Sequence, residues 1–212
     1  MRQWRYDQAA LVATLRHSLP HRDTSSEFHT PNGPFTLVPL PGSRSSLVWV
    51  GSARETETRA ALSDEALAVE IEERSASILG AVEIEGARQI FPLSGMTANR
   101  FAAKRVALVG EAAHIFPPIG AQGLNLGYRD IAALADLLTG PPADPGGFEV
   151  LDAYERARRG DVLTRTAAVD TLNRTLLTDF LPAQAARGLG LFLLDKLPPL
   201  RRAVMRQGVA AK

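Results

Sequence analysis

The first half of the chain shows short apolar runs separated by turn-forming residues. Runs rich in Val, Leu, Phe and Trp occupy positions 8–16, 35–40 and 46–51. Pro-Asn-Gly-Pro at 31–34 and Pro-Gly-Ser-Arg at 41–44 separate them. Strand-forming residues bounded by Pro, Gly and Asn predict an antiparallel meander.

Helical signals interrupt this pattern and then dominate the second half. Ser63 followed by Asp64 and Glu65 predicts a helix start, and the helix extends to about Leu79 before the stop signal of Gly80. Residues 88–93 predict a further strand.

Residues 105–110 form a short apolar run that ends in glycine, which predicts a buried strand feeding a turn. Beyond it, apolar residues recur at helical spacing and predict one packed face of a helix, comprising Leu124, Gly127, Ile131, Leu134 and Leu138. A turn-rich connector at 140–147 precedes a long helix over 148–172 and two further helical segments.

Composition narrows the class of protein. The 212 residues are 45% hydrophobic and 22% charged, which is typical of a globular protein. A net charge of +1 gives no electrostatic support for nucleic-acid binding. There is no cysteine, and the four histidines are scattered, so we expect no metal site and a reducing, cytoplasmic location. No apolar run is long enough to predict a membrane span or a signal peptide.

The segment 105–138 carries the most informative chemistry. A strand delivers Gly110 and Glu111 to a sheet edge, and Gly123-Leu124-Asn125 opens a helix. The Glu111 carboxylate is an acceptor for sugar or ribityl hydroxyls, and free N–H groups at a helix start attract negative charge. These two features suit a flavin better than a metal or a nucleoside triphosphate. The alternative is that the segment is an ordinary strand end, loop and helix.

The same segment resembles the second flavin-binding motif of the p-hydroxybenzoate hydroxylase superfamily. That motif reads Gly-Asp-Ala-Ala-His, a Pro, then Gly-Gln-Gly-x-Asn-x-Gly and an Asp. Ten positions match it in order, namely Gly110, Ala112, Ala113, His114, Pro118, Gln122, Gly123, Asn125, Gly127 and Asp130. Two positions depart, because Glu111 replaces Asp and Ala121 replaces Gly. A further resemblance, to ubiquinone-pathway hydroxylases, covers residues 20–51 and fades toward the end of the chain.

The resemblance implies FAD as cofactor, NAD(P)H as reductant and hydroxylation of an aromatic, polyprenyl-phenol ring in ubiquinone biosynthesis. It assigns cofactor binding to Gly110, Glu111, Pro118, Gln122, Gly123, Leu124 and Asn125. No catalytic side chain is assigned. For His114 we expect a structural hydrogen-bonding role, although the sequence shows no chemical partner for it.

The implied fold is α+β, with three parts. Residues 1–100 are expected to form a substrate-binding sheet domain of antiparallel or mixed strands, 101–140 the ring-side strand, loop and helix of the FAD-binding domain, and 141–212 a helical region. The Gly-x-Gly-x-x-Gly turn that cradles a pyrophosphate is absent, and Gly188-Leu-Gly190 lacks its third glycine. We therefore expect the amino-terminal Rossmann half to be missing and the chain to be inactive alone.

Three expectations concern partners. The alternative to an enzyme part is a non-catalytic module or scaffold in a ubiquinone-biosynthesis complex. The basic ending, residues 187–212, fits either a helix at the inner-membrane surface or a helix packed on its own domain. Apolar surface left uncovered by a missing half predicts self-association, most simply as a two-fold dimer.

Overall fold

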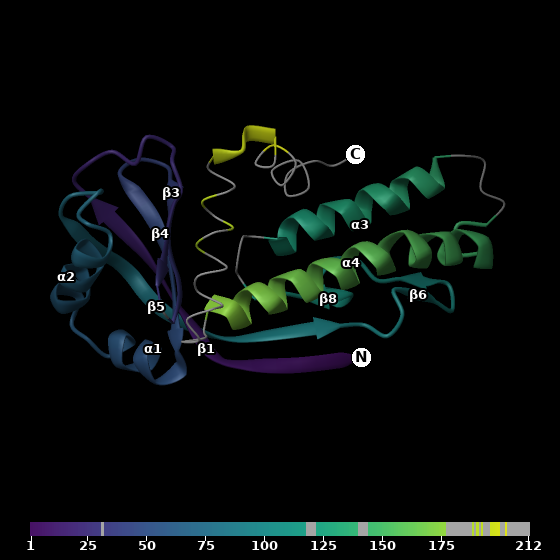
Figure 1. Ribbon diagram of the computed structural model, residues 1–212, viewed down its shortest axis with the longest axis horizontal. Helices are drawn as coiled ribbons and strands as arrows, with labels where there is room; N and C mark the ends of the chain where they lie inside the picture. The colour runs from purple at the N-terminus through teal and green to yellow at the C-terminus, as the bar shows by residue number, and fades with distance from the viewer. Residues whose placement is uncertain are drawn as a thin grey trace. The chain divides into compact units, whose positions relative to one another are not determined.

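A computed structural model describes residues 1–30, 32–117, 122–139, 144–176 and isolated positions between 188 and 202 (Figure 1). The chain divides into two compact units, Arg5–Leu93 and Met1–Trp4 with Ser94–Lys212. Two long strands, β1 (Arg2–His17) and β5 (Val82–Thr97), contribute residues to both units.

The unit Arg5–Leu93 contains the predicted meander. Its other elements are β2 (Ser26–Thr30), β3 (Gly33–Leu40), β4 (Arg44–Ser52), α1 (Ala53–Ala60) and α2 (Asp64–Arg74). Antiparallel pairing joins β2 to β3, β3 to β4, and β4 to β1. The full strand order is β2-β3-β4-β1-β5-β8. The strands expected at 8–16, 35–40, 46–51 and 88–93 are all confirmed.

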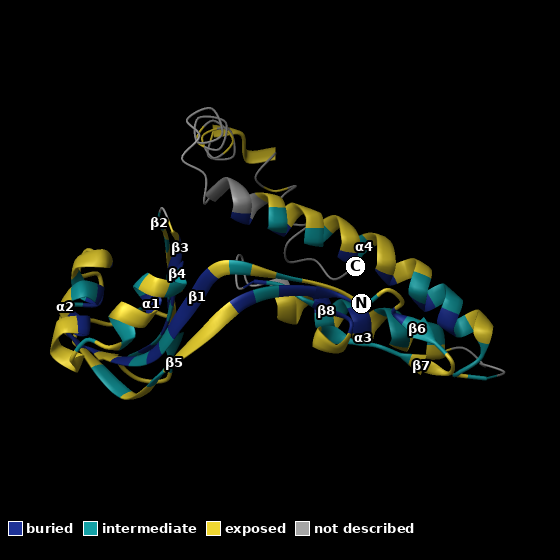
Figure 2. Cartoon of the chain, turned by 90° about the horizontal axis from the view of Figure 1, so that it is seen from below, coloured by how far each residue is buried: buried dark blue, intermediate teal, exposed yellow. Residues whose placement is uncertain are grey.

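Alternate residues of the strands build the core of this unit. Leu11 pairs with Trp49, and Leu47 pairs with both Ala13 and Leu37, so every second residue faces the same side. The core is completed by Leu67 and Ile71 of α2, by Leu79, and by Val82 at the start of β5. Buried positions on β1 are dark blue in Figure 2. The alternation of apolar residues in the sequence therefore reflects strands that direct successive side chains to opposite faces of a sheet.

The two helices begin at serine caps. Ser52 and Glu55 form a capping box at the start of α1, and the Ser63 hydroxyl accepts from Ala66 N–H at the start of α2. The predicted end of α2 at about Leu79 is wrong, because the helix ends at Arg74. Ala76 and Ser77 have φ of 50° and 53°, a left-handed conformation that does not continue a right-handed helix.

The second unit holds β6 (Ala102–Ala103), β7 (Val106–Ala107), the 3-10 turn η1 (Gly110–Ala112), β8 (His114–Ile115), α3 (Gln122–Leu138) and α4 (Phe148–Leu176). Its core combines Phe101, Ala113, Tyr154 and Val162. The long helix predicted from residue 148 is confirmed. The two helical segments expected after it lie largely outside the described residues. Among the described helices, none combines the length and the hydrophobicity needed to cross a bilayer.

The strand expected at 105–110 is not the buried strand that the sequence predicts. Only Val106 and Ala107 pair, with the two-residue β6, and Val106 is 55% exposed. Lys104 and Arg105 form the tip of this hairpin with positive φ. A strand is buried when neighbours cover it on both sides, and the described part of the chain provides one short neighbour.

The packed face of α3 agrees with the prediction at Gly127 and Leu134 and differs from it elsewhere. Leu124 and Ile131 are 71% and 54% exposed, whereas Leu126 and Asp130 are buried. The face that packs on α4 carries Asp130 among apolar residues, namely Ala133, Leu134 and Leu137. A buried carboxylate counts as polar in a hydrophobic pattern, and this shifted the predicted face away from the real one.

Candidate functional site

A buried carboxylate connects the three parts of the motif at 105–138. Asp130 of α3 accepts hydrogen bonds through Oδ2 from Gly110 N–H (2.9 Å) and from His114 Nε2 (2.7 Å). Its Oδ1 accepts from Arg158 Nε of α4 (2.7 Å). We call these four residues the Asp130 cluster. It joins the turn, the short strand and two helices at one point.

The cluster keeps Asp130 ionised. Burial by itself acts to raise the pKa of Asp130, but the hydrogen bonds from His114, Arg158 and Gly110 outweigh it, so the pKa lies below its ordinary value. Arg158 in turn donates to Asp161 (2.9 Å). Burial acts to lower the pKa of Arg158, and the two carboxylates outweigh it and raise that pKa. The buried charges are therefore paired, as buried charges must be.

Helix α4 fixes the strand-loop segment at two further points. The Tyr154 hydroxyl donates to Leu108 C=O (2.8 Å), and burial raises the pKa of this phenol. The Glu155 carboxylate accepts from the N–H groups of Phe101 (2.5 Å) and Ala102 (2.9 Å). Together with Arg158, these side chains hold residues 101–110 to one face of α4. The backbone of a segment with little sheet pairing is thus satisfied by side chains.

Two glycines allow η1 to approach α3 closely. Gly110 has φ +60°, which strains any residue with a side chain. A Cβ on Gly127 would lie 3.6 Å from the Gly110 Cα, so the two backbones are in near contact. Asp130 can reach Gly110 N–H because nothing bulkier stands between the turn and the helix. These two glycines therefore have a structural role in the packing of η1 on α3, whether or not a ligand binds there.

The expected cofactor-binding residues that the structure describes lie on η1 and α3, the elements that this cluster joins. Glu111 is exposed on η1, with no hydrogen bond or ion pair to a described residue. Gly123, Leu124 and Asn125 are exposed on the first turn of α3, which begins at Gln122. A Cβ on Gly123 would meet nothing within 4 Å. Pro118 and the side chain of Gln122 lie outside the described residues.

These positions fit the ring-side half of a flavin site. The exposed carboxylate of Glu111 is available to accept hydroxyl hydrogen bonds. The N–H groups of a helix's first turn have no acceptor within the helix, and they favour negative charge. The open space beside Gly123 lets a ligand approach the backbone. Within the described ranges, no group of three His, Cys, Asp or Glu side chains could hold a metal ion.

His114 has a structural role, as expected, but the expectation that it lacks a partner is wrong. Its side chain is 1% exposed and bonded to Asp130. Sequence reasoning also gave no role to Asp130, Tyr154 or Arg158. A signal existed, because Tyr154 and Arg158 are four residues apart and so share a helix face.

Comparisons with known proteins agree with this geometry. The model of the FAD binding domain family matches residues 8–168. Ubiquinone hydroxylase UbiL of Rhodospirillum rubrum is 39% identical over 207 residues, covering 96% of this chain and 48% of that protein. The 3-demethoxyubiquinol 3-hydroxylase of Escherichia coli is 29% identical, covering 96% and 52%. The chain thus spans about half the length of these curated relatives.

Solved structures show the same fold. The p-nitrophenol 4-monooxygenase PnpA of Pseudomonas putida superposes with a TM-score of 0.70 at 21% identity, covering 99% of this chain and 55% of that one. PqsL of Pseudomonas aeruginosa, in complex with 2-aminobenzoylacetate, gives 0.70 at 23% identity, covering 84% and 50%. At this identity the likeness concerns the fold, and the α+β prediction is confirmed. With the family model matching residues 8–168, the chain belongs to the FAD binding domain family.

Proposed function

We propose that this chain is the substrate-sheet and ring-side part of an FAD-dependent monooxygenase that hydroxylates an aromatic ring in ubiquinone biosynthesis. One observation carries the proposal. The Asp130 cluster holds η1 and α3 together, and these two elements carry the exposed Glu111 and the exposed residues 123–125, whose chemistry suits a flavin. The relatives named ubiquinone hydroxylase UbiL and 3-demethoxyubiquinol 3-hydroxylase support an aromatic substrate, and the polyprenyl chain on that ring is part of the proposal.

In this proposal the Glu111 carboxylate accepts hydrogen bonds from ribityl hydroxyls, and the N–H groups of 123–125 stabilise negative charge on the ring side. FAD, when bound and reduced by NAD(P)H, supplies the oxygen-transfer chemistry. The chain contributes position and exclusion of water, and no acid or base is assigned. The proposed set of FAD-binding residues also includes Gly110, Pro118, Gln122 and Leu124.

We also propose a separate role for each of three parts of the chain. Residues 1–100 bind the substrate, 101–140 contact the ring side of the cofactor, and 141–212 support them. In support, α4 holds residues 101–110 through Tyr154 and Glu155, and it holds Asp130 of α3 through Arg158. We further propose that the basic ending contacts a membrane surface or a biosynthetic complex. We also propose a cytoplasmic location.

A chimera tests the function. In it, this chain replaces the matching half of Rhodospirillum rubrum UbiL, which supplies the remaining half. We expect a yellow protein that restores ubiquinone hydroxylation. Gly123→Val in the chimera is expected to abolish bound flavin and to leave the melting temperature of the flavin-free protein unchanged, because the valine enters open space but blocks approach to the backbone.

Gly160→Val is the matched control, since Gly160 is an exposed helical glycine with nothing within 4 Å. It should leave the flavin content unchanged. A folded but colourless chimera would argue against the proposal and favour the alternative of a non-catalytic module. Equal flavin content in the two glycine variants would show that residues 123–125 do not contact the flavin.

We also propose that the isolated chain self-associates through the exposed face of α3, with a second copy as the partner. Leu124, Tyr128 and Ile131 are 71%, 63% and 54% exposed and follow one another at helical spacing. We expect sedimentation to show a dimer that Ile131→Glu converts to monomer. Leu163→Glu, at a residue 45% exposed on α4, is the control and should remain dimeric. A monomer at every concentration of the unsubstituted chain would contradict this.

A further inference from the structure

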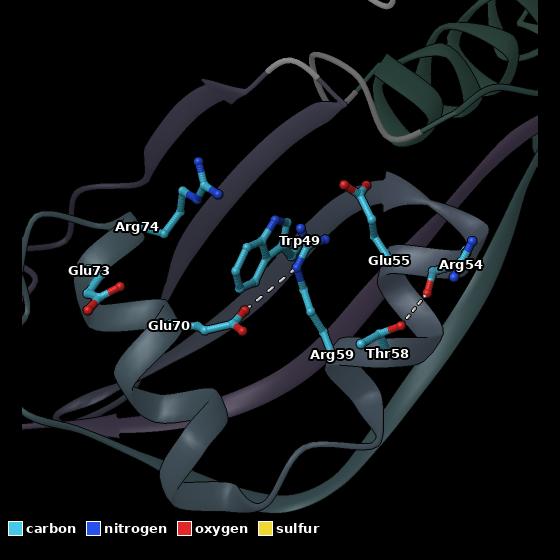
Figure 3. A pocket seen from close by; sticks show the side chains of 8 residues that line it. All are labelled: Trp49, Arg54, Glu55, Thr58, Arg59, Glu70, Glu73 and Arg74. Carbon is cyan, nitrogen blue, oxygen red and sulfur yellow. Dashed lines mark hydrogen bonds and ion pairs between the residues drawn. The ribbon is translucent and has the colours of Figure 1, made fainter.

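A groove lies between α1 and α2 within the unit Arg5–Leu93. Its volume is about 690 Å³, within the range of small-molecule sites. The indole of Trp49 forms its base, and Figure 3 shows Arg59 of α1 and Glu70 of α2 reaching toward that ring. The other lining side chains are arginines, glutamates and a threonine. We call it the Trp49 groove.

Arg59 is held in place at the base of the groove. Its guanidinium lies 4.3 Å from the centroid of the Trp49 ring, and its Nε lies 3.8 Å from a Glu70 oxygen. A Cβ on Gly51 would come within 2.8 Å of Arg59 Nη1, so the glycine leaves the room that this arginine needs. The side chain is 16% exposed. Its position is therefore built into the fold.

A second arginine approaches the same ring from the other helix. The guanidinium of Arg74 lies 5.7 Å from the Trp49 centroid. Burial, and then the charge of Arg74, lower the pKa of Arg59 against the opposing effect of Glu55 and Glu70. Neither guanidinium donates a hydrogen bond to any residue that the structure describes. Two cations with unused donors thus share one indole.

The glutamates of the groove do not satisfy these donors. Glu55 accepts from Ser52 and Asn32 in the capping arrangement of α1. Glu70 approaches Arg59 only at ion-pair distance, and Glu73 is exposed. These carboxylates nevertheless set a limit on the charge of an occupant, since they repel a second negative charge in the same space.

We propose that the Trp49 groove binds a carboxylate, held by the guanidinium groups of Arg59 and Arg74. The planar fork of arginine N–H donors matches a carboxylate bidentately, and one negative charge between the two cations relieves their repulsion. A phosphate, with its higher charge, fits less well beside Glu70 and Glu73. The carboxylate comes either from a small organic acid or from an acidic side chain of a partner protein.

The test uses Trp49 as the reporter. In the Trp4→Phe background Trp49 is the single tryptophan of the 212-residue chain, so its emission can be followed as glutarate is added at constant ionic strength. We expect a saturable change that dimethyl glutarate does not produce. Arg74→Gln should weaken glutarate binding about tenfold or more, since it removes hydrogen bonds to a charged group. Calorimetry on the unsubstituted chain gives the same measurement without the Trp4 substitution.

Arg22→Gln is the matched control, because Arg22 is exposed outside the groove and loses the same charge. It should leave glutarate binding unchanged. A glutamate-rich peptide binding more tightly than glutarate would support a protein source, and glutarate binding alone would support a small acid. Equal weakening by Arg22→Gln and Arg74→Gln, tighter binding of inorganic phosphate, or no saturable change would overturn the proposal.

Discussion

Replacing Asp130 with alanine is expected to lower the free energy of unfolding by about 3 kcal/mol. The substitution leaves Gly110 N–H and His114 Nε2 without their acceptor and removes one of two carboxylates from the buried Arg158. Arg158 keeps its bond to Asp161, which places the loss at the lower end of the range for a broken buried ion pair. Urea unfolding followed by circular dichroism gives this value.

Asp136→Ala is the control on the same helix. Asp136 is exposed, and the Thr139 hydroxyl donates to its backbone carbonyl, which alanine retains. Its removal should change the unfolding free energy by less than about 0.5 kcal/mol. Equal losses for the two variants would mean that the Asp130 cluster does not hold the segment 101–138 to α4.

The isolated 212-residue chain is expected to be colourless after purification. The ring-side groups proposed to contact FAD supply only part of the contacts, and the sequence contains no Gly-x-Gly-x-x-Gly turn for the pyrophosphate. Absorbance in the flavin bands and the fluorescence of flavin released by heating would measure this directly. The UbiL chimera, purified alongside, provides the positive control for recovery of flavin.

Addition of FAD during purification should not change this result. Flavin released in near-stoichiometric amount from the isolated chain would contradict the prediction. It would mean that Glu111 and the start of α3 supply enough affinity without a pyrophosphate site. In that case the proposed ring-side contacts would be supported. The expectation that FAD binding requires the pyrophosphate-binding half of the enzyme would be wrong.

The elements that the sequence predicted well are those with a strong local period. Alternation along β1, β3 and β4 was visible because one face of these strands packs on α2 in the main core, while the other face carries half-buried residues and a smaller cluster around Ala10, Val50 and Leu93. Helix α1 was missed because its only buried residue is Thr56, and so it carries no apolar stripe. The Ser52 and Glu55 capping pair was the available signal.

The errors share one physical cause. The face of α3 was misplaced because Asp130 occupies an inward position, and the run 105–110 was assigned to a buried strand from its apolar residues alone. Both inferences depend on what covers a segment. Periodicity reports which residues are apolar, and it does not report which partner arrives from elsewhere in the chain.

For the candidate site, the sequence by itself determined the motif, the helix start at 122–125 and the family to which they point. Only the tertiary structure decided that Asp130 joins Gly110, His114 and Arg158, since Arg158 lies 28 residues away from it along the chain. A buried carboxylate must be paired, but many cations in the sequence could have paired with it. Folding selects Arg158 because α3 packs on α4 and brings that side chain to the carboxylate.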